Sequence, residues 1–192
     1  MKKTVMMMLC LAFLLSGVSA LEYGPKLGLA FSKYTDEIEG LEPKFKTGFL
    51  VGGFLRIPVT GMPLTVIGEA LYTQKGSHFE EEGFDADIRM DYFELALLGK
   101  YPVLPHVGVY LGPSLAFLTK VEMEEDGVGT ADITDEFKGS EFSLNIGGQM
   151  DVNAFVFDLR FNFGLTDTND SLNGGDVSIK TNTLTLSAGY IF

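Results

Sequence analysis

Apolar and polar residues alternate along most of the chain beyond residue 20. In the segment FVFDLRFNFGL, residues 155–165, every second position is apolar and polar residues fill most of the positions between. A period of two is typical of a β-strand whose two faces meet different surroundings. Each such segment has about ten residues, the length of a tilted strand that crosses a bilayer. The pattern predicts eight strands, at 23–31, 49–57, 64–72, 93–101, 109–117, 142–152, 155–165 and 184–192.

The connections between these segments alternate in length. If neighbouring strands are antiparallel, the short connections lie at one end of the sheet and the long ones at the other. An even number of strands with this polarity is typical of an outer-membrane barrel, whose short turns face the periplasm. We therefore predict an all-β fold, an eight-stranded antiparallel transmembrane up-and-down β-barrel. Its short connections are 58–63, 102–106 and 153–154, and its long, mostly acidic ones are 35–46, 76–90, 120–140 and 166–180.

The strand faces opposite the apolar rows carry charged, amide and glycine residues. These suit the narrow interior of an eight-stranded barrel, which side chains can just fill. A charge in that interior must be paired, because an unpaired buried charge costs several kcal/mol. Glu69 and Arg160 are expected at similar heights on facing strands. We predict an interior charge network, acting as a structural plug or alternatively as a gate or proton path, made of Arg56, Glu69, Glu94, Lys100, Asp158 and Arg160.

The first twenty residues follow a different pattern. Lys2 and Lys3 precede an uninterrupted apolar stretch at 5–15, and small residues follow at 18–20. This order is typical of a secretory signal peptide, and the apolar stretch is too short to span a bilayer. We therefore expect residues 1–20 to be a signal peptide and residues 21–192 to be the barrel domain. The only cysteine, Cys10, lacks the small residues that precede a lipoprotein cleavage site.

The composition limits the partners of the chain. The formal net charge is −12, and Lys and Arg do not cluster as phosphate binding requires, so nucleic acid is not an expected partner. We expect contacts with outer-membrane lipid and lipopolysaccharide, where divalent ions could bridge the acidic loops to the anionic surface. A protein partner at the loops is possible, and we expect a monomer.

Six motifs carry a resemblance to a known family. Their order and spacing resemble the PorT-like small outer-membrane β-barrel proteins of Gram-negative bacteria. The resemblance implies an eight-stranded barrel in the outer membrane, inserted there by the outer-membrane assembly machinery. That machinery favours a terminal Phe with an aromatic or apolar residue two positions earlier, which Phe192 and Tyr190 supply. The motifs are KLGLAFS (26–32), GEALYTQKG (68–76), YFELALLGKY (92–101), YLGPSLAFL (110–118), DLRFNFGLTD (158–167) and LTLSAGYIF (184–192).

Some segments of the chain contain residue types that are found in catalytic or calcium-binding sites. Ser77 and His78 could form part of a lipid-modifying site, but neighbouring strand residues point to opposite faces, and a nucleophile needs its base within hydrogen-bond reach. The acidic segments 124–136 and 167–176 could bind calcium, but Leu172 stands where the calcium loop requires glycine. We therefore predict no enzyme activity, no cofactor and no metal.

The sequence leaves three functions open. The first is a sealed barrel with acidic extracellular loops and a structural or partner-docking role. The second is a narrow pore or transport protein for small solutes, although eight strands leave little open lumen. The third is a periplasmic lipocalin-like carrier, in which the phenylalanine rows would line an internal pocket and the charged rows would face water.

Overall fold

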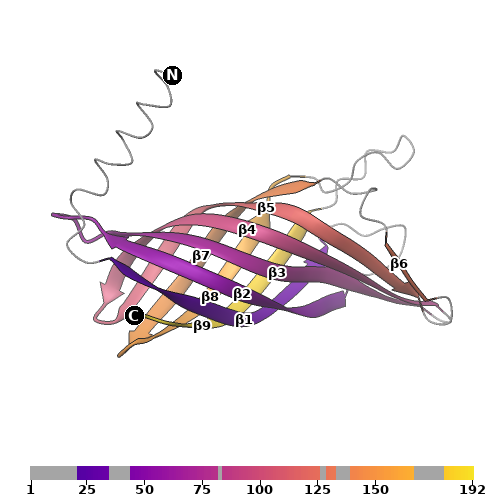
Figure 1. The fold of residues 1–192 in the computed structure, drawn as a ribbon, viewed down its shortest axis with the longest axis horizontal. Helices are drawn as coiled ribbons and strands as arrows, with labels where there is room; N and C mark the ends of the chain where they lie inside the picture. Colours follow the sequence, from indigo (N-terminus) through magenta and orange to yellow (C-terminus); the bar gives the residue numbers. More distant parts are fainter. Residues whose placement is uncertain (1–20, 35–43, 82–83, 126–128, 133–138, 167–179) are drawn as a thin grey trace, which may run out of the picture.

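The computed structural model describes residues 21–34, 44–81, 84–125, 129–132, 139–166 and 180–192. All strand pairings in these segments are antiparallel, and pairing between β4 and β5 closes the sheet into a barrel (Figure 1). The strands are β1 (Glu22–Tyr34), β2 (Lys44–Pro58), β3 (Thr65–Glu81), β4 (Phe84–Leu104), β5 (Val107–Glu125), β6 (Gly129–Asp132), β7 (Ser140–Val152), β8 (Phe155–Gly164) and β9 (Thr181–Tyr190).

Eight of these strands make the barrel wall. Going round it, the order is β4, β3, β2, β1, β9, β8, β7, β5 and back to β4, and β6 pairs only with the outer end of β5. The eight-stranded antiparallel barrel predicted from the period-two pattern is therefore confirmed. Within the described segments, the structure has no helix with the length and apolar character needed to span a membrane.

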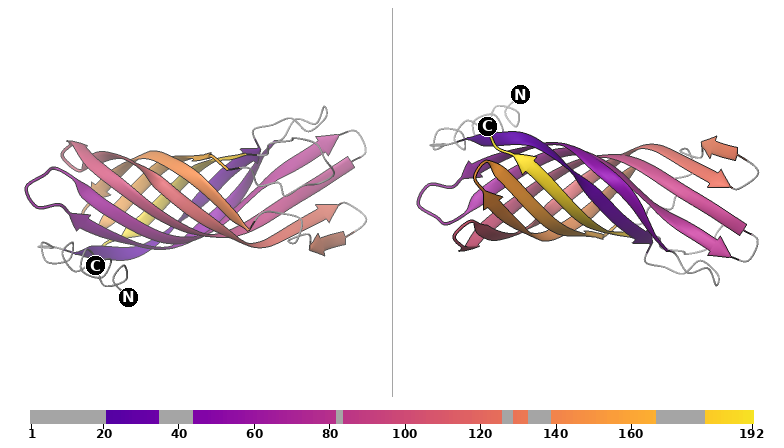
Figure 2. Two further views of the ribbon diagram at one scale, coloured as in Figure 1. Left: turned by 90° about the horizontal axis from the view of Figure 1, so that it is seen from above. Right: turned by 90° about the horizontal axis from the view of Figure 1, so that it is seen from below.

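Short turns gather at one end of the barrel, which we call the short-turn end (Figure 2). Asn153 and His106 occupy two of these turns with φ angles of 54° and 68°, and Gly61 lies in the third with a φ of 83°. Positive φ angles suit glycine and asparagine, and the turn formed by Pro105 and His106 follows the type II pattern, in which proline precedes the left-handed residue. The short connections predicted from the sequence thus correspond to real turns.

The long connections were predicted to be longer than they are. Residues 76–90 were assigned to a loop, but β3 continues to Glu81 and β4 begins at Phe84, with Gly76 paired to Arg89 within the hairpin. Similarly, the 120–140 segment contains the end of β5 and all of β6. These extensions project beyond the rest of the wall at the end opposite the short turns (Figure 2). The apolar alternation did not predict these extensions, because a hairpin outside lipid needs no row of apolar residues on its outer face.

Side-chain exposure alternates along the wall strands as predicted. In β8, Phe157 and Leu159 are 43% and 54% exposed, whereas Asp158 and Arg160 between them are buried. The phenylalanine rows therefore face outward, so the inverted carrier interpretation is wrong. The interior is more apolar than expected, because a cluster of six buried residues packs inside it together with the half-buried Ile191. That cluster is Phe54, Ile67, Ala96, Leu98, Tyr110 and Val156.

Candidate functional site

The centre of the lumen contains four interlocked charged side chains, which we call the central plug: Lys26, Glu69, Asp158 and Arg160. Arg160 Nη2 lies 2.6 Å from one oxygen of Glu69, and Lys26 Nζ lies 2.8 Å from the other. Lys26 also reaches Asp158 at 3.3 Å. All four side chains are at most 4% exposed, and their two positive charges match two negative ones. Balanced, mutually bonded charges satisfy the condition for burial.

Tyr110 of β5 completes the central plug. Arg160 Nε donates a hydrogen bond of 3.0 Å to its hydroxyl, which in turn donates one of 3.0 Å to Asp158. Gly147 on the neighbouring strand β7 leaves the room that the phenol needs, because a Cβ at this position would overlap the tyrosine hydroxyl. The small interior residues noted in the sequence thus make space for large ones.

A second charge cluster, the lower cluster, lies toward the short-turn end. The Arg56 guanidinium and the Lys100 ammonium each lie 2.8 Å from the carboxylate of Asp151. Arg56 also donates to Gln149 at 2.9 Å and to Glu22 at 3.2 Å. The two cations are almost fully buried, whereas the side chains of Asp151 and Glu22 are 27% and 40% exposed. The cations thus depend on carboxylates that solvent reaches.

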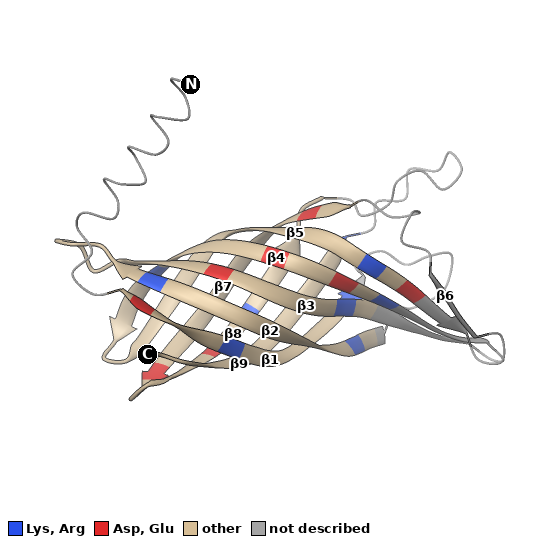
Figure 3. Cartoon of the chain, viewed as in Figure 1, with Lys and Arg blue, Asp and Glu red and all other residues tan. Residues whose placement is uncertain are grey.

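A third charge cluster, the upper cluster, lies toward the long connections. Lys75 Nζ is 3.1 Å from Glu141 and 4.0 Å from Glu94. Ser143 donates a hydrogen bond of 2.9 Å to Glu141. Charged residues therefore recur at several heights along the wall strands (Figure 3). Together with the apolar packing they fill the interior.

All six residues of the predicted network are buried in the lumen. The structure brings Glu69, Asp158 and Arg160 together, but Arg56 and Lys100 belong to the lower cluster and Glu94 to the upper one. The single network expected from the sequence is therefore three separate groups. Its missed members are Lys26, Lys75, Tyr110, Glu141 and Asp151, all of which are on the inward phase of their strands. Lys26, Tyr110 and Asp151 lie within the predicted segments, so reading every inward position there would have found them, whereas Lys75 and Glu141 required the alternation to be extended past the segment ends.

Ser77 and His78, the residues considered for catalysis, are consecutive residues of β3. The other histidine of the chain, His106, lies in the β4–β5 turn at the opposite end of the barrel. Among the described residues, no group of three or more His, Cys, Asp or Glu could hold a metal ion. The candidate calcium segments 124–136 and 167–176 fall largely outside the described residues, so that interpretation stays untested.

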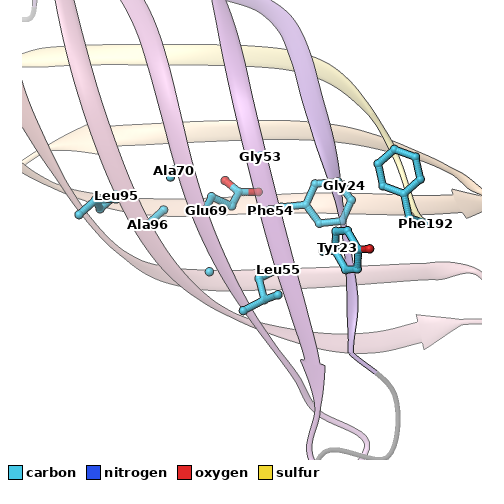
Figure 4. A pocket seen from close by; sticks show the side chains of 11 residues that line it. Tyr23, Gly24, Gly53, Phe54, Leu55, Glu69, Ala70, Leu95, Ala96 and Phe192 are labelled. Carbon is cyan, nitrogen blue, oxygen red and sulfur yellow. The ribbon is translucent and has the colours of Figure 1, made fainter. Parts of the chain in front are cut away.

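An apolar groove of about 600 Å³ runs along the outer wall over β1 to β4 (Figure 4). Gly53, Gly68 and Ala70 form its floor, because they lack large side chains, and larger side chains such as Leu55 and Leu95 border it. Because this wall presents apolar side chains, the groove suits hydrocarbon chains of lipid.

A closed antiparallel barrel with apolar outer rows and a charged, filled interior is a transmembrane β-barrel, the only sheet architecture that leaves no unpaired edge in lipid. The model of the family described as Outer membrane protein beta-barrel domain matches residues 13–170. The chain belongs to this family, and it is an outer-membrane protein of the Gram-negative envelope. In barrels of this class the short turns face the periplasm and the longer loops face outward.

Solved structures support the fold. Neisserial surface protein A is 12% identical with a TM-score of 0.59, and the match covers 91% of this chain and 100% of that one. The attachment invasion locus protein Ail of Yersinia pestis is 19% identical with a TM-score of 0.50, covering 90% of this chain and 99% of that one. No curated protein sequence matched the chain. Similarity at sequence identities this low shows the fold alone and does not show the function.

Proposed function

We propose that this protein is a sealed outer-membrane barrel that holds its extracellular β-hairpins and acidic loops at the cell surface, with a structural or partner-docking role. One observation carries the proposal: the central plug crosses the lumen as a balanced set of buried ion pairs, with Glu69 and Arg160 only 2.6 Å apart. An eight-stranded barrel has just enough interior for side chains to fill.

The extracellular extensions support the docking part of the proposal. The β3–β4 hairpin continues past the rest of the wall with paired backbone through Glu81 and Phe84, and β5 pairs with β6 beside it. Paired backbone holds a shape that a partner can recognise, because ordering it on binding costs little entropy. Lipopolysaccharide is the first surface that these extensions would meet, and the monomer is the proposed state.

Several finer assignments belong to the same proposal. Export by the signal peptide at 1–20 is a proposal that rests on the sequence pattern, since these residues lie outside the described ones. The PorT-like type rests on motifs such as 92–101 and 110–118. A non-catalytic role rests on the argument that consecutive strand residues such as Ser77 and His78 point to opposite faces, and on the place of His106 in the turn at the other end of β4.

A narrow pore is the competing function, and one observation favours it. A small cavity of about 10 Å³, enough for one water molecule, lies between the central plug and the upper cluster and is lined by Arg160, Lys75 and Glu94. If the plug rearranged, this polar cavity would lie on the path of a solute.

Conductance in a planar bilayer separates the two functions. We expect the purified barrel to give no resolvable current steps, and a variant in which residues 77–88 are replaced by an Asn-Gly turn between Gly76 and Arg89 to stay equally closed, because it keeps the plug. Steps in both proteins would contradict sealing. Steps in the trimmed variant alone would mean that the extension, and not the plug, closes the barrel.

A further inference from the structure

A cavity of about 360 Å³ lies at the periplasmic end of the barrel, and we call it the vestibule. Its rim is apolar and open, with Met62 in the β2–β3 turn 59% exposed. Arg56 and Lys100 line it from positions that are only 3% and 7% exposed. An apolar entrance that leads to a few buried polar groups is the usual build of a small-molecule site, and the volume is at the lower end of the usual range. The other lining residues include Pro63, Leu64, Asp151 and Ile191.

The two cations of the vestibule share one close carboxylate, although Arg56 Nη2 also donates a hydrogen bond of 2.9 Å to Gln149. Asp151 accepts from both Arg56 and Lys100 at 2.8 Å, so one carboxylate serves two positive charges. The second carboxylate, Glu22, lies 3.2 Å from Arg56 Nη1, and its side chain is 40% exposed. Among the described residues, nothing accepts a hydrogen bond from Arg56 Nε. Buried donors of this kind gain from another acceptor.

We propose that the vestibule binds a small organic carboxylate carrying an apolar group, taken from the periplasm. The carboxylate displaces the exposed Glu22 from Arg56 and accepts a further hydrogen bond from Lys100, whose ammonium has three N–H donors. The apolar group packs against Met62, Leu64 and Ile191 at the rim.

This inference goes beyond the sealed barrel and does not depend on it. The central plug lies above the vestibule, so the ligand binds without crossing the membrane. If binding fails, the conductance experiment still decides whether the barrel is sealed.

The test uses the folded barrel in lipid nanodiscs, with N-acetyl-L-leucine as the probe and its uncharged N-methylamide as the control. Titration is followed by the NMR resonance of the Arg56 Nε–H group and by calorimetry. We expect a saturable shift with the carboxylate and binding of the amide weaker by about tenfold or more, because the amide lacks the charge that two cations attract.

Two variants sharpen the test. Glu22→Gln removes the competing carboxylate, so the probe should bind about threefold tighter or more, while Lys100→Met should weaken it by about fivefold or more. Glu122→Gln is the matched control, since this acid pairs with Lys120 on the outer end of β5 and should leave the affinity unchanged. Folding of each variant is checked by its heat-dependent shift on a gel.

Equal affinity for the carboxylate and the amide would overturn the proposal, and so would unchanged or weaker binding to Glu22→Gln. Because Glu22 is at the rim and 40% exposed, that variant is expected to fold even if Lys100→Met does not, and its result then decides.

Discussion

Each buried charge in the lumen is compensated by the opposite charges of its neighbours. Glu69 lies between Arg160 and Lys26, and its side chain is 1% exposed. Removing one member of such a group leaves an uncompensated charge where water cannot reach it, whereas removing an acid and a base together keeps the balance.

The Glu69–Arg160 pair makes this testable. We expect Glu69→Gln to lower the free energy of unfolding by about 3 to 5 kcal/mol, and the double variant Glu69→Gln with Arg160→Met to recover most of the loss. In the double variant Lys26 still has Asp158 at 3.3 Å. Urea unfolding in lipid vesicles measures the cycle. Lys120→Gln, which breaks an exposed pair, should cost no more than about 1 kcal/mol. Strictly additive effects in the cycle would contradict the pairing.

Glycines in the wall differ in what surrounds them. A Cβ on the buried Gly112 would overlap the carbonyl oxygen of Leu97 on the neighbouring strand, whereas one on Gly68 would meet nothing within 4 Å. We therefore expect Gly112→Ala to destabilise the barrel by about 1 to 3 kcal/mol and Gly68→Ala to be tolerated. The same urea titration compares them, and equal costs would mean that the close approach is not real.

Each wall strand has a row of outward-facing apolar residues, and this row matters for the strand's place in the membrane as much as its backbone pairing does. Leu159 occupies the middle of β8 and is 54% exposed, and it faces lipid because the fold is a transmembrane barrel. The row therefore determines whether the strand can enter the membrane.

We expect Leu159→Arg to cost about 2 to 4 kcal/mol and to reduce insertion, since a charge near the bilayer middle is desolvated. Val103→Arg is the matched control, because Val103 is also half exposed but lies next to the β4–β5 turn, where the cost should fall to about 0 to 1 kcal/mol. Folding yield in vesicles measures both. A normal yield for Leu159→Arg would argue against lipid contact at this face.

The first and last strands of the barrel lie next to each other in its wall. β1 pairs with β9, and the Phe192 amide donates a hydrogen bond of 3.0 Å to Tyr23 beside it. The Phe192 ring is 70% exposed and lies 5.3 Å from that of Tyr190. The family resemblance implies an assembly signal at Tyr190 and Phe192, and their position beside Tyr23 gives them a structural contact as well.

Assembly and structure can be separated at Phe192. Phe192→Ala should lower the amount of folded barrel in the outer membrane of cells severalfold, but lower the unfolding free energy in vitro by only about 0.5 to 1.5 kcal/mol. Phe155→Ala removes a comparable exposed ring, 5.4 Å from Tyr190, and should affect only stability. Membrane fractionation with heat-shift gels gives the first quantity. Equal losses in cells for both variants would refute a specific signal.

Sequence reasoning succeeded wherever one face of a strand meets lipid. The alternation in FVFDLRFNFGL and its seven counterparts was enough to predict the eight wall strands, their antiparallel order and the inward phase of the predicted charges. It failed where no apolar outward row is required, as in the extensions of β3, β4 and β5, which carry many charged residues but are still paired as strands.

The sequence by itself determined which residues face inward, because the period of two is local and the membrane demands an apolar outer row. Only the tertiary structure decided which of the inward-facing residues pair with one another in the lumen. Arg160 pairs with Glu69, which is 91 positions away in the chain, and Lys100 pairs with Asp151 and not with Glu94. The closure of the barrel and the tilt of its strands decide which inward-facing residues lie at the same height.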